Sequence, residues 1–587
     1  MSAFDKTTRR SRVGFVVTLA IVLVFVGRLV DLQLVQAPAL AAAASQRRTL
    51  QRTTFGNRGE ITDRSGNVLA ESVIRYNITA APNVARDYSA KNAAGKVVTV
   101  TVRDAMSHIA ALTGVSVDTL VNDISSDPKA NFEYLVKDVD VDVYRKVTAL
   151  SIPYVYLERT TARTYPDGGV GGNLVGFVGT DGPQAGLEYA DNKCLAGKNG
   201  SESYEIGADG VELPGAAQTI SRAIDGGTLT TTLDSDLQYE AQEELAQQTK
   251  LLGAQSASAI VMRVSDASLM AVADYPSVDP NNVNGTSTAF LGSKSFTALY
   301  EPGSIMKSLM AAALLDAGKA TPTTPVTVPD VRHFPWGGSV ADAEAHPPEN
   351  LTLTGVLQNS SNVGITLLAQ DLTAQQRYDY LRAFGLGAPS AVDFPGEPTA
   401  PLPPASTWDK QTNYNSMFGQ GISATAIQMA NAYQAIANHG VRIPVKLVEK
   451  CTSSNGTVTD VPSNNGTRVV SAAAADETVT MLRNVLTNGT LDGMIPIPGY
   501  TIAAKTGTAQ VADKPGGGYG DDYITSVAGL LPAQNPQYVV LITFDEPTHG
   551  KTSAAVAPAF RAITSDVLQA FRIPPSTPTT QPFPSTW

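Results

Sequence analysis

Apolar residues in this chain form one long run near the amino terminus. A basic segment that ends at Arg12 precedes an apolar stretch from Val13 to Val26, and further apolar residues follow as far as Val35. The first stretch alone is shorter than the roughly 30 Å hydrocarbon core of a membrane, so we expect one spanning helix over 13–35. Basic residues before such a helix favour a cytoplasmic amino terminus. The pattern therefore predicts a basic cytoplasmic tail at 1–12, a single-pass anchor at 13–35 and an extracytoplasmic remainder.

Two charged residues fall inside the predicted anchor. Arg28 and Asp31 lie one helical turn apart, a spacing that permits an ion pair. The pair fits either a contact with another membrane protein or snorkelling at the outer boundary. A cleavable signal peptide is the rival interpretation, because Ala37-Pro-Ala39 and Ala41-Ala-Ala43 have the small residues of a cleavage site. Both sites lie beyond the charged pair and well past the apolar run, which favours an uncleaved anchor.

Beyond the anchor, the spacing of apolar residues predicts two further regions. Met106, Ile109, Leu112 and Leu120 are spaced for one buried face of a helix over 103–123, in a loop-rich first region. The pattern changes at about Asp225. The later elements are a helix at 237–251, a strand hairpin at 259–264 and 268–273, and a second hairpin at 524–530 and 538–544. Strands at both ends with helices between them predict an antiparallel sheet with packed helices, so the expected class is α+β and multidomain.

Composition narrows the function classes. The 587 residues exceed what one compact core holds, and 43% hydrophobic residues with 17% charged residues are ordinary for folded domains. A formal net charge of −11 argues against nucleic acid as a partner, because phosphate binding needs a basic face. The histidines show no metal-ligand spacing, so no metal site is predicted. Cys194 and Cys451 fall in different predicted regions, so we expect them to be unpaired, although export would permit a disulfide.

Three short strings in the second region carry residue types suited to acyl transfer. They are Ser304-Ile-Met-Lys307, Ser360-Ser361-Asn362 and Lys505-Thr506-Gly507. A serine hydroxyl needs a nearby base to act as a nucleophile, and Lys307 lies one helical turn from Ser304. That amine must be neutral to act as a base, which requires desolvation or neighbouring cations.

Chance and ordinary structural roles are the competing interpretations of these strings. The first pattern recurs at Ser126-Asp-Pro-Lys129, where Pro128 disfavours a helix, whereas Lys-Thr-Gly occurs once. Lys307 alone fits a surface lysine, and the other two strings fit a polar helix terminus and an edge-strand lysine before a turn. The apolar residues around Lys307 argue instead for a buried helix.

In their order and local context, the strings resemble the S-x-x-K, S-x-N and K-T-G motifs of penicillin-binding proteins. Further strings resemble class B members of this family, especially the division type that includes FtsI. These are Arg58-Gly-Glu-Ile-Thr-Asp-Arg64, Arg163-Thr-Tyr-Pro166, Gly186-Leu-Glu-Tyr189, Phe384-Gly-Leu-Gly387 and Phe418-Gly-Gln-Gly-Ile-Ser423. The resemblance implies a non-catalytic pedestal at 45–222, a penicillin-recognising transpeptidase domain at 225–572 and, from composition, a disordered Pro/Ser/Thr-rich tail at 573–587.

The resemblance also assigns roles to the site residues. Ser304 is the expected nucleophile, Lys307 its base and Ser360 a proton relay, while Asn362 binds the substrate backbone. Lys505 is expected to bind the substrate carboxylate, with Thr506 and Thr508 adding hydroxyl contacts and Gly507 leaving room for a close approach of ligand and backbone. Backbone N–H groups of Ser304 and Thr508 would form the oxyanion hole. No cofactor and no metal are expected.

The implied activity is D,D-transpeptidation of peptidoglycan during septal cell-wall synthesis at the bacterial plasma membrane. The expected partners are stem peptides that end in D-Ala-D-Ala, β-lactams as inhibitors and a separate membrane glycosyltransferase. An elongation-type or sporulation-type transpeptidase is the nearest alternative. A β-lactam sensor and a non-catalytic division scaffold are alternatives from other classes. No E-x-x-x-N string is placed like the deacylating glutamate of class A β-lactamases, which favours a transpeptidase over a hydrolase.

Overall fold

This computed structural model describes most of the chain, in two compact units. The described residues are 3–91, 95–205, 207, 213, 215, 217–399, 402–489, 491–512, 518–577 and 583–587. Residues 1–2 of the predicted basic tail and 578–582 of the predicted carboxy-terminal tail lie outside them. One unit comprises residues 1–57 with 197–225, and the other comprises 58–196 with 226–587. The predicted pedestal at 45–222 is therefore divided between the two units.

The first unit contains the predicted anchor. Helix α1 (Ala3–Val30) continues into a π-helical turn (Asp31–Val35), and the stretch from Arg9 to Val35 is long and apolar enough to cross a membrane. Its apolar side chains are exposed, as expected of a lipid-facing surface. The expected ion pair is present, with Arg28 Nη1 2.5 Å from Asp31 Oδ2. The remaining elements of this unit are α2 (Ala37–Arg48) and a sheet of β1 (Thr49–Thr54), β10 (Gly200–Glu205) and β11 (Gln218–Ser221).

The second unit begins with a mixed α+β region. Long strand β3 (Val68–Ala80) pairs with β6 (Glu133–Val139) and with β7 (Val155–Thr164). The helix expected at 103–123 is two helices, α3 (Val102–Thr113) and α4 (Val117–Ser126). The break falls at Gly114, whose φ of 76° is left-handed, and Ser116 then caps α4 by accepting from the Thr119 N–H. The expected apolar spacing is thus satisfied by two short helices.

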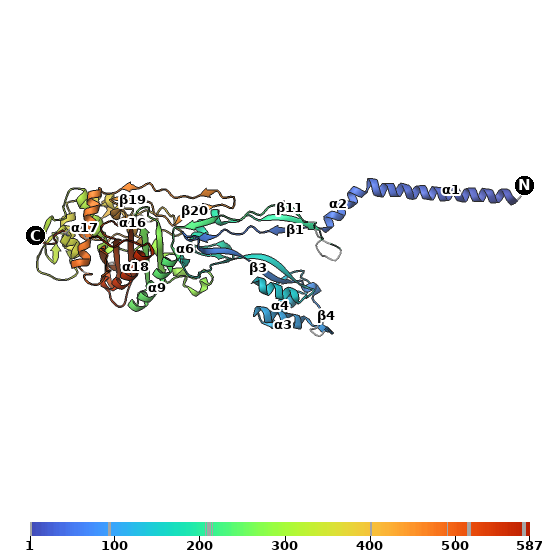
Figure 1. Ribbon diagram of the computed structural model, residues 1–587, viewed down its shortest axis with the longest axis horizontal. Helices are drawn as coiled ribbons and strands as arrows, with labels where there is room; N and C mark the ends of the chain where they lie inside the picture. Colours follow the sequence, from blue (N-terminus) through green and yellow to red (C-terminus); the bar gives the residue numbers. More distant parts are fainter. Residues whose placement is uncertain are drawn as a thin grey trace. The chain divides into compact units, whose positions relative to one another are not determined.

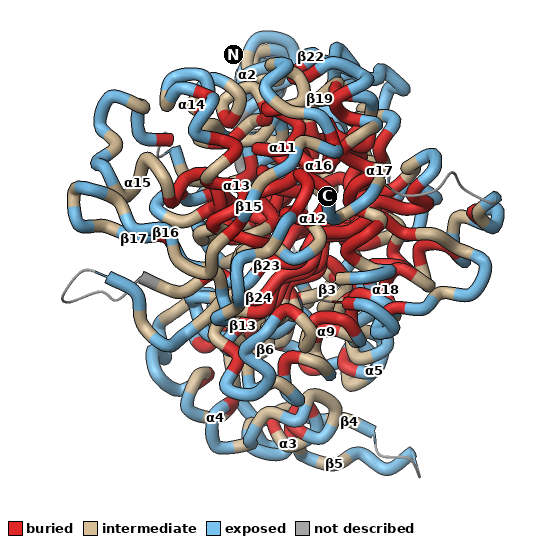
Figure 2. The backbone as a smooth tube through the Cα atoms, turned by 90° about the vertical axis from the view of Figure 1, so that its left-hand side faces the viewer, coloured by how far each residue is buried: buried red, intermediate tan, exposed pale blue. Residues whose placement is uncertain are grey.

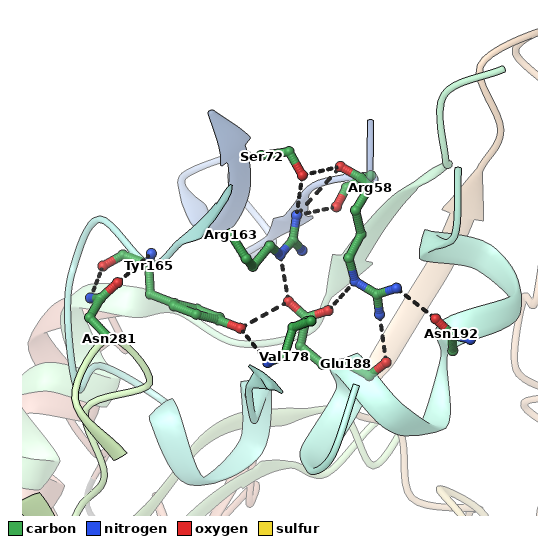
Figure 3. A network of polar contacts seen from close by, with 9 residues as sticks. Arg58, Ser72, Arg163, Tyr165, Val178, Glu188, Asn192 and Asn281 are labelled. Carbon is green, nitrogen blue, oxygen red and sulfur yellow. Dashed lines mark hydrogen bonds and ion pairs between the residues drawn. The ribbon is translucent and has the colours of Figure 1, made fainter. Parts of the chain in front are cut away.

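Buried Glu188 organises the base of this region (Figure 3). Its carboxylate accepts from Arg58 Nε at 2.5 Å and from Arg163 Nε at 2.6 Å, so two guanidiniums offset one fully buried charge. Tyr165 joins the same network, with its hydroxyl 3.5 Å from Glu188. Asn281, from the region after residue 225, donates to the Tyr165 carbonyl at 2.8 Å. Three of the strings found in the sequence analysis therefore meet at one carboxylate.

A five-stranded antiparallel sheet forms the centre of the second unit, in the order β14-β13-β25-β24-β23. Its strands are β13 (Ser256–Arg263), β14 (Leu269–Tyr275), β23 (Ala503–Ala512), β24 (Tyr519–Leu531) and β25 (Tyr538–Asp545). Both predicted hairpins are therefore confirmed, and they join through β13 and β25. Among the described residues, β23 pairs with β24 alone and is an edge strand.

Helices cover both faces of this sheet, as Figures 1 and 2 show. Alternate residues of β13 point to opposite sides, so Ala259 and Val261 pack in one core and Ile260 and Met262 in the other. Helices α9 (Ser235–Leu252) and α18 (Ala557–Ala570) line the first core. Helices α11 (Met306–Asp316), α16 (Ala426–Ala437) and α17 (Ala472–Asn488) line the second, and α16 is buried along its whole length. The predicted helix at 237–251 is confirmed as α9.

The other named elements of the second unit are shorter. They are β2 (Ile61–Thr62), β4 (Tyr88–Lys91), β5 (Val97–Val100), α5 (Val141–Ala149), α6 (Gly172–Val175), β8 (Val178–Gly179), β9 (Gly182–Pro183), α7 (Gly186–Ala190), α8 (Asn192–Leu195), β12 (Thr228–Thr231), α10 (Lys294–Thr297), β15 (Pro325–Val328), β16 (Val331–His333), β17 (Ser339–Ala341), β18 (Glu349–Thr352), α12 (Leu353–Gln358), α13 (Asn362–Ala369), α14 (Ala374–Ala383), α15 (Lys410–Asn415), β19 (Val441–Arg442), β20 (Val448–Thr452), β21 (Val458–Thr459) and β22 (Thr467–Arg468). Single 3₁₀ turns lie at 82–84, 283–285, 288–290, 303–305, 405–407 and 553–556.

The expectation of unpaired cysteines is wrong. Cys194 and Cys451 form a disulfide, with their Cα atoms 6.1 Å apart. Strand β20, which carries Cys451, pairs with β12, and β12 pairs in turn with β2 of the pedestal region. Cys194 lies on α8, and its carbonyl accepts from the Gly227 N–H just before β12 at 2.8 Å, so α8 and this sheet together bring cysteines 257 residues apart into contact.

The expectation of a disordered tail is wrong for its described residues. Ser576 N–H donates to the Gly499 carbonyl at 2.8 Å. Residues 583–587 then lie along β18, where Thr586 forms an antiparallel bridge with Leu351. Composition alone misses this arrangement, because it depends on the backbone bridge to β18 and on Phe583, which packs against the core.

Replacing Cys194 and Cys451 together by serine should lower the free energy of unfolding by about 2–4 kcal/mol, because the cross-link closes a long loop of the unfolded chain. Denaturant unfolding of the two full-length proteins, followed by tryptophan fluorescence, measures this change. Alkylation before and after reduction is the control. Full alkylation of both cysteines without a reductant would contradict the disulfide.

Candidate active site

Ser304 lies in a tight turn that leads into a buried helix. A 3₁₀ turn over Gly303–Ile305 precedes α11, and Gly303 has a left-handed φ of 58°. Gly303 N–H donates to the Gly419 carbonyl at 2.9 Å, and a Cβ added at Gly419 would lie 2.3 Å from the Gly303 carbonyl oxygen. Glycine at 419 is therefore required for this close approach. The Phe418-Gly-Gln-Gly string therefore packs directly against the Ser304 turn.

Tyr433, which the sequence analysis did not single out, hydrogen-bonds the same turn. The buried Tyr433 hydroxyl, on α16, donates to the Ile305 carbonyl at 2.8 Å and lies 2.9 Å from Ser308 Oγ. Nothing in the local sequence marks Tyr433, because its partners lie on a different helix.

Lys307 is completely buried on the first turn of α11. Its Nζ lies 2.9 Å from Ser304 Oγ and 3.2 Å from Ser360 Oγ, and it also donates to the Ser360 carbonyl. The apolar environment predicted for this lysine is confirmed by α11, whose described residues are almost all buried. One amine is thus shared between two serines.

Ser360 is presented by an unusual backbone conformation. It follows α12 and has a φ of 56°, which is uncommon for a residue with a side chain. Such strained positions are frequent at functional sites, where the surrounding structure over-determines them. Here the conformation turns both the carbonyl and the hydroxyl of Ser360 toward Lys307.

Lys505 is a second lysine that contacts Ser360. Its Nζ lies 2.9 Å from Ser360 Oγ, and it also donates to the Thr506 carbonyl at 3.2 Å and to Thr506 Oγ1 at 3.3 Å. The side chain is completely buried on edge strand β23. The Ser360 hydroxyl therefore lies between two lysine amines.

The electrostatics of this pair favour loss of protons. Burial lowers the pKa of Lys307 to about 7, although the carboxylate of Asp342 opposes the shift. Burial, and then the neighbouring Lys307, lower the pKa of Lys505 well below its ordinary value. Because the two amines face one hydroxyl, a proton on either one disfavours a proton on the other. The requirement for a neutral base at Lys307 is met at about neutral pH.

Thr508 and Gly507 bring β23 against the Ser304 turn. A Cβ added at Gly303 would lie 3.2 Å from the Thr508 carbonyl oxygen, so the backbones of the turn and the strand are in close contact. A Cβ added at Gly507 would lie 2.2 Å from Ser526 Oγ and 3.2 Å from the Pro302 carbonyl oxygen. The space beside Gly507 is thus already filled by the protein, and its glycine serves this packing. The Thr508 side chain is exposed on the same strand.

The remaining predicted residue, Asn362, begins α13. Its Nδ2 donates to the Ala341 carbonyl at 2.9 Å. Asp342, which the sequence analysis missed, accepts from Ser361 Oγ at 2.6 Å and from the Val363 N–H at 3.0 Å. His346 Nε2 lies 3.1 Å from the same carboxylate. The end of β17 therefore holds the Ser-Ser-Asn string through Ala341 and Asp342.

The structure brings all the predicted site residues into one region at the edge of the central sheet. In the described part of the chain, no group of three or more His, Cys, Asp or Glu side chains is arranged to hold a metal ion. The fold and this arrangement define an active-serine enzyme of the penicillin-recognising class.

Comparisons with known proteins agree with this class. Residues 257–565 match the model of the penicillin-binding protein transpeptidase domain, and residues 53–231 match the penicillin-binding protein dimerisation domain. Penicillin-binding protein PbpB of Mycobacterium tuberculosis is 34% identical, over 96% of this chain and 85% of its own length. Peptidoglycan D,D-transpeptidase FtsI of Escherichia coli K12 is 30% identical, over 94% of this chain and 90% of its own length.

Solved structures give the same result. A peptidoglycan synthetase from Bifidobacterium adolescentis has a TM-score of 0.72 at 30% identity and covers 92% of this chain and all of its own. Penicillin-binding protein 3 of Mycobacterium tuberculosis, solved with ampicillin, has a TM-score of 0.70 at 29% identity and covers 91% of this chain and all of its own. The chain belongs to the class B penicillin-binding proteins, a family of serine acyl-transfer enzymes.

Replacing Gly507 by alanine should slow acylation by penicillin at least roughly tenfold, because the new methyl group displaces β23 from the Ser304 turn. Adding Ser526→Ala should restore part of the rate, since it removes the oxygen 2.2 Å away. Stopped-flow measurement with a fluorescent penicillin compares the single and double variants with Ser526→Ala alone. A double variant that acylates no faster than Gly507→Ala would contradict this account.

Proposed function

We propose that this chain is a peptidoglycan D,D-transpeptidase that forms an acyl-enzyme on Ser304. The observation that carries the proposal is the convergence of Lys307 and Lys505 on Ser360, with Lys307 also 2.9 Å from Ser304 Oγ. The substrate is a stem peptide that ends in D-Ala-D-Ala, and β-lactams inhibit by acylating the same serine. The names of the relatives support this substrate class.

In the first half-reaction, Ser304 Oγ attacks the carbonyl carbon of the penultimate D-alanine. Neutral Lys307 takes the hydroxyl proton, and N–H groups of Ser304 and Thr508 stabilise the oxyanion. The C–N bond then breaks, and the terminal D-alanine leaves as an amine that receives a proton from Lys307 through the Ser360 hydroxyl. A hydroxyl that lies between two amines can both accept and donate, as this relay requires.

Lys505 is proposed to respond to the carboxylate of the substrate. In the free site, burial and Lys307 disfavour the charged form of Lys505. An incoming carboxylate supplies an opposite charge and therefore raises the pKa of Lys505. Protonated Lys505 then disfavours a proton on Lys307, which keeps the base neutral. Substrate binding and activation of Ser304 are coupled in this way.

The second half-reaction transfers the acyl group to an amine of a neighbouring stem peptide. That amine attacks the ester carbonyl and loses a proton to Lys307. The acyl C–O bond then breaks, and Lys307 returns the proton to Ser304 Oγ as the new amide forms. We expect Asn362 to hydrogen-bond the backbone of the peptide, and the edge of β23 to bind extended peptide backbone by strand addition.

We assign the enzyme to septal synthesis at the bacterial plasma membrane. The Ser360-Ser-Asn-Val-Gly364 and Phe418-Gly-Gln-Gly421 strings support a division-type member over an elongation-type one. The apolar span from Arg9 to Val35 supports a single-pass anchor, with the basic end cytoplasmic and the catalytic domain outside. A membrane glycosyltransferase would then supply the glycan strands. Depletion of the enzyme should block septation while elongation continues, and arrest of elongation would favour the alternative.

Incubation of the full-length protein with a penicillin should add one penicillin mass to the chain, and Ser304→Ala should abolish this adduct. Intact-mass spectrometry detects it directly. Ser126→Ala, in the other S-x-x-K string, is the matched control and should label normally. Rapid loss of the adduct would indicate a hydrolase, and its absence from folded wild-type protein would leave the non-catalytic scaffold.

The rate of acylation should rise with pH and level off above an apparent pKa of about 7, the value to which burial lowers Lys307. The sign follows from the chemistry, because only the neutral amine accepts a proton and its fraction increases as pH rises. Initial rates from about pH 5 to about pH 9, within the range where the protein remains folded, give the profile. A rate that is flat across this range would contradict Lys307 as the base.

A further inference from the structure

The carboxy-terminal residues 583–587 lie along the segment that leads to Ser360 and join it by one antiparallel bridge. Thr586 bridges Leu351 of β18, and Trp587 N–H donates to the Asn350 carbonyl at 3.4 Å. The half-buried Phe583 packs against the core that contains α11 and α16. This segment is therefore held both by a backbone bridge and by an apolar contact.

Its contacts concentrate on Thr352, the residue that caps α12. Thr352 is 1% exposed, and its N–H donates to the Ser585 carbonyl at 3.0 Å. Its hydroxyl donates to the Pro584 carbonyl at 2.6 Å and accepts from the Gly355 N–H at 3.1 Å. The carbonyl of Pro584 thus orients the hydroxyl so that a lone pair faces the helix, and the tail completes the cap of α12.

A glycine in α12 fits the tail closely. A Cβ added at Gly355 would lie 2.0 Å from the Ser585 carbonyl oxygen, and this oxygen is backbone with little freedom to move. Only glycine therefore permits the tail to lie against the helix here.

The other end of α12 lies next to the catalytic serine. The helix ends at Gln358, and Ser360 follows two residues later with its left-handed backbone. Buried Asn484 of α17 donates to the Phe583 carbonyl at 3.1 Å and lies 3.5 Å from Gln358 Oε1, so it links the tail to this end as well. Since α12 is a short rigid element, a shift at its start is transmitted to Ser360 within two turns.

We infer that residues 583–587 are a positioning segment, which holds α12 so that Ser360 lies between Lys307 and Lys505. The inference rests on the proposed function of Ser360. None of the five residues touches the reacting atoms, and they act only through α12. Their loss should slow the chemical step of acylation, because small displacements of a relay group are costly in rate.

Removal of residues 583–587 from the full-length protein tests this inference. The first-order rate of acylation by a fluorescent penicillin should fall roughly tenfold, while the noncovalent affinity and the fold, followed by melting temperature, are largely retained. Thr586→Ala is the matched control, because its side chain is exposed, and it should acylate like the wild type. A truncated protein that acylates at the wild-type rate would overturn the inference.

Gly355→Ala separates a positioning role from a general loss of stability. In the full-length chain it should evict the tail and reproduce the slow acylation of the truncated protein. In the truncated chain it should have little further effect, because Ser585 is gone and the remaining contact, at 3.2 Å, is with the flexible end of the Leu351 side chain. If Gly355→Ala slows acylation by the same factor in the full-length and the truncated chain, the effect lies in α12 itself, and the inference is overturned.

Restoring the acylation rate of the truncated protein with an added peptide is the decisive experiment. The peptide Phe-Pro-Ser-Thr-Trp, added to the truncated protein, should restore the first-order rate saturably, and it should fail when Gly355→Ala is present. Thr352→Ser should acylate normally and Thr352→Val slowly, since only the hydroxyl makes both contacts. Failure of the peptide to restore any rate would contradict the inference. A full-length wild-type protein that is not acylated at all would instead refute the proposed function.

Discussion

The structure depends on the burial of two lysine amines around one serine hydroxyl. Lys307 and Lys505 are completely buried, and both lie within hydrogen-bonding distance of Ser360 Oγ. Burial of an unpaired ammonium is strongly unfavourable, so the pair responds by losing protons. The same constraint that would destabilise the fold therefore supplies a neutral base beside Ser304. The lowered pKa values of the two lysines result from burial in the surrounding core, and the three motifs supply the residues that react.

The rest of the second unit serves to bring these groups together. The edge strand β23 supplies Lys505, the buried helix α11 supplies Lys307, and the end of α12 supplies Ser360. Gly303 and Gly507 let β23 and the Ser304 turn approach more closely than side chains would allow, and Gly419 does the same for the 418–421 segment behind that turn. Tyr433 hydrogen-bonds the Ser304 turn, Asp342 hydrogen-bonds the Ser-Ser-Asn string, and residues 583–587 contact the start of α12. The Glu188 network and the Cys194–Cys451 disulfide join the pedestal region to this assembly.

Local signals in the sequence were sufficient for much of this arrangement. Alternating or continuous apolar runs predicted both hairpins, and the spacing of Ser304 and Lys307 predicted their contact. Properties that depend on distant partners were missed. Asp342 and Tyr433 carry no local mark, and the cysteines meet because β12 contacts α8 on one side and pairs with β20 on the other. The helix at 103–123 was predicted as continuous because periodicity does not register the left-handed Gly114. Proline and serine content predicted disorder at the carboxy terminus, where backbone pairing and Phe583 give order instead.

The most direct test of the account is to supply the enzyme with peptidoglycan strands whose stem peptides end in D-Ala-D-Ala and to identify the products by mass spectrometry. The account predicts cross-linked dimers, with one D-alanine released for each cross-link, and no product from Ser304→Ala. Release of D-alanine without cross-links would identify a carboxypeptidase, and no release from a folded protein that binds penicillin would contradict catalysis of acyl transfer from the peptide.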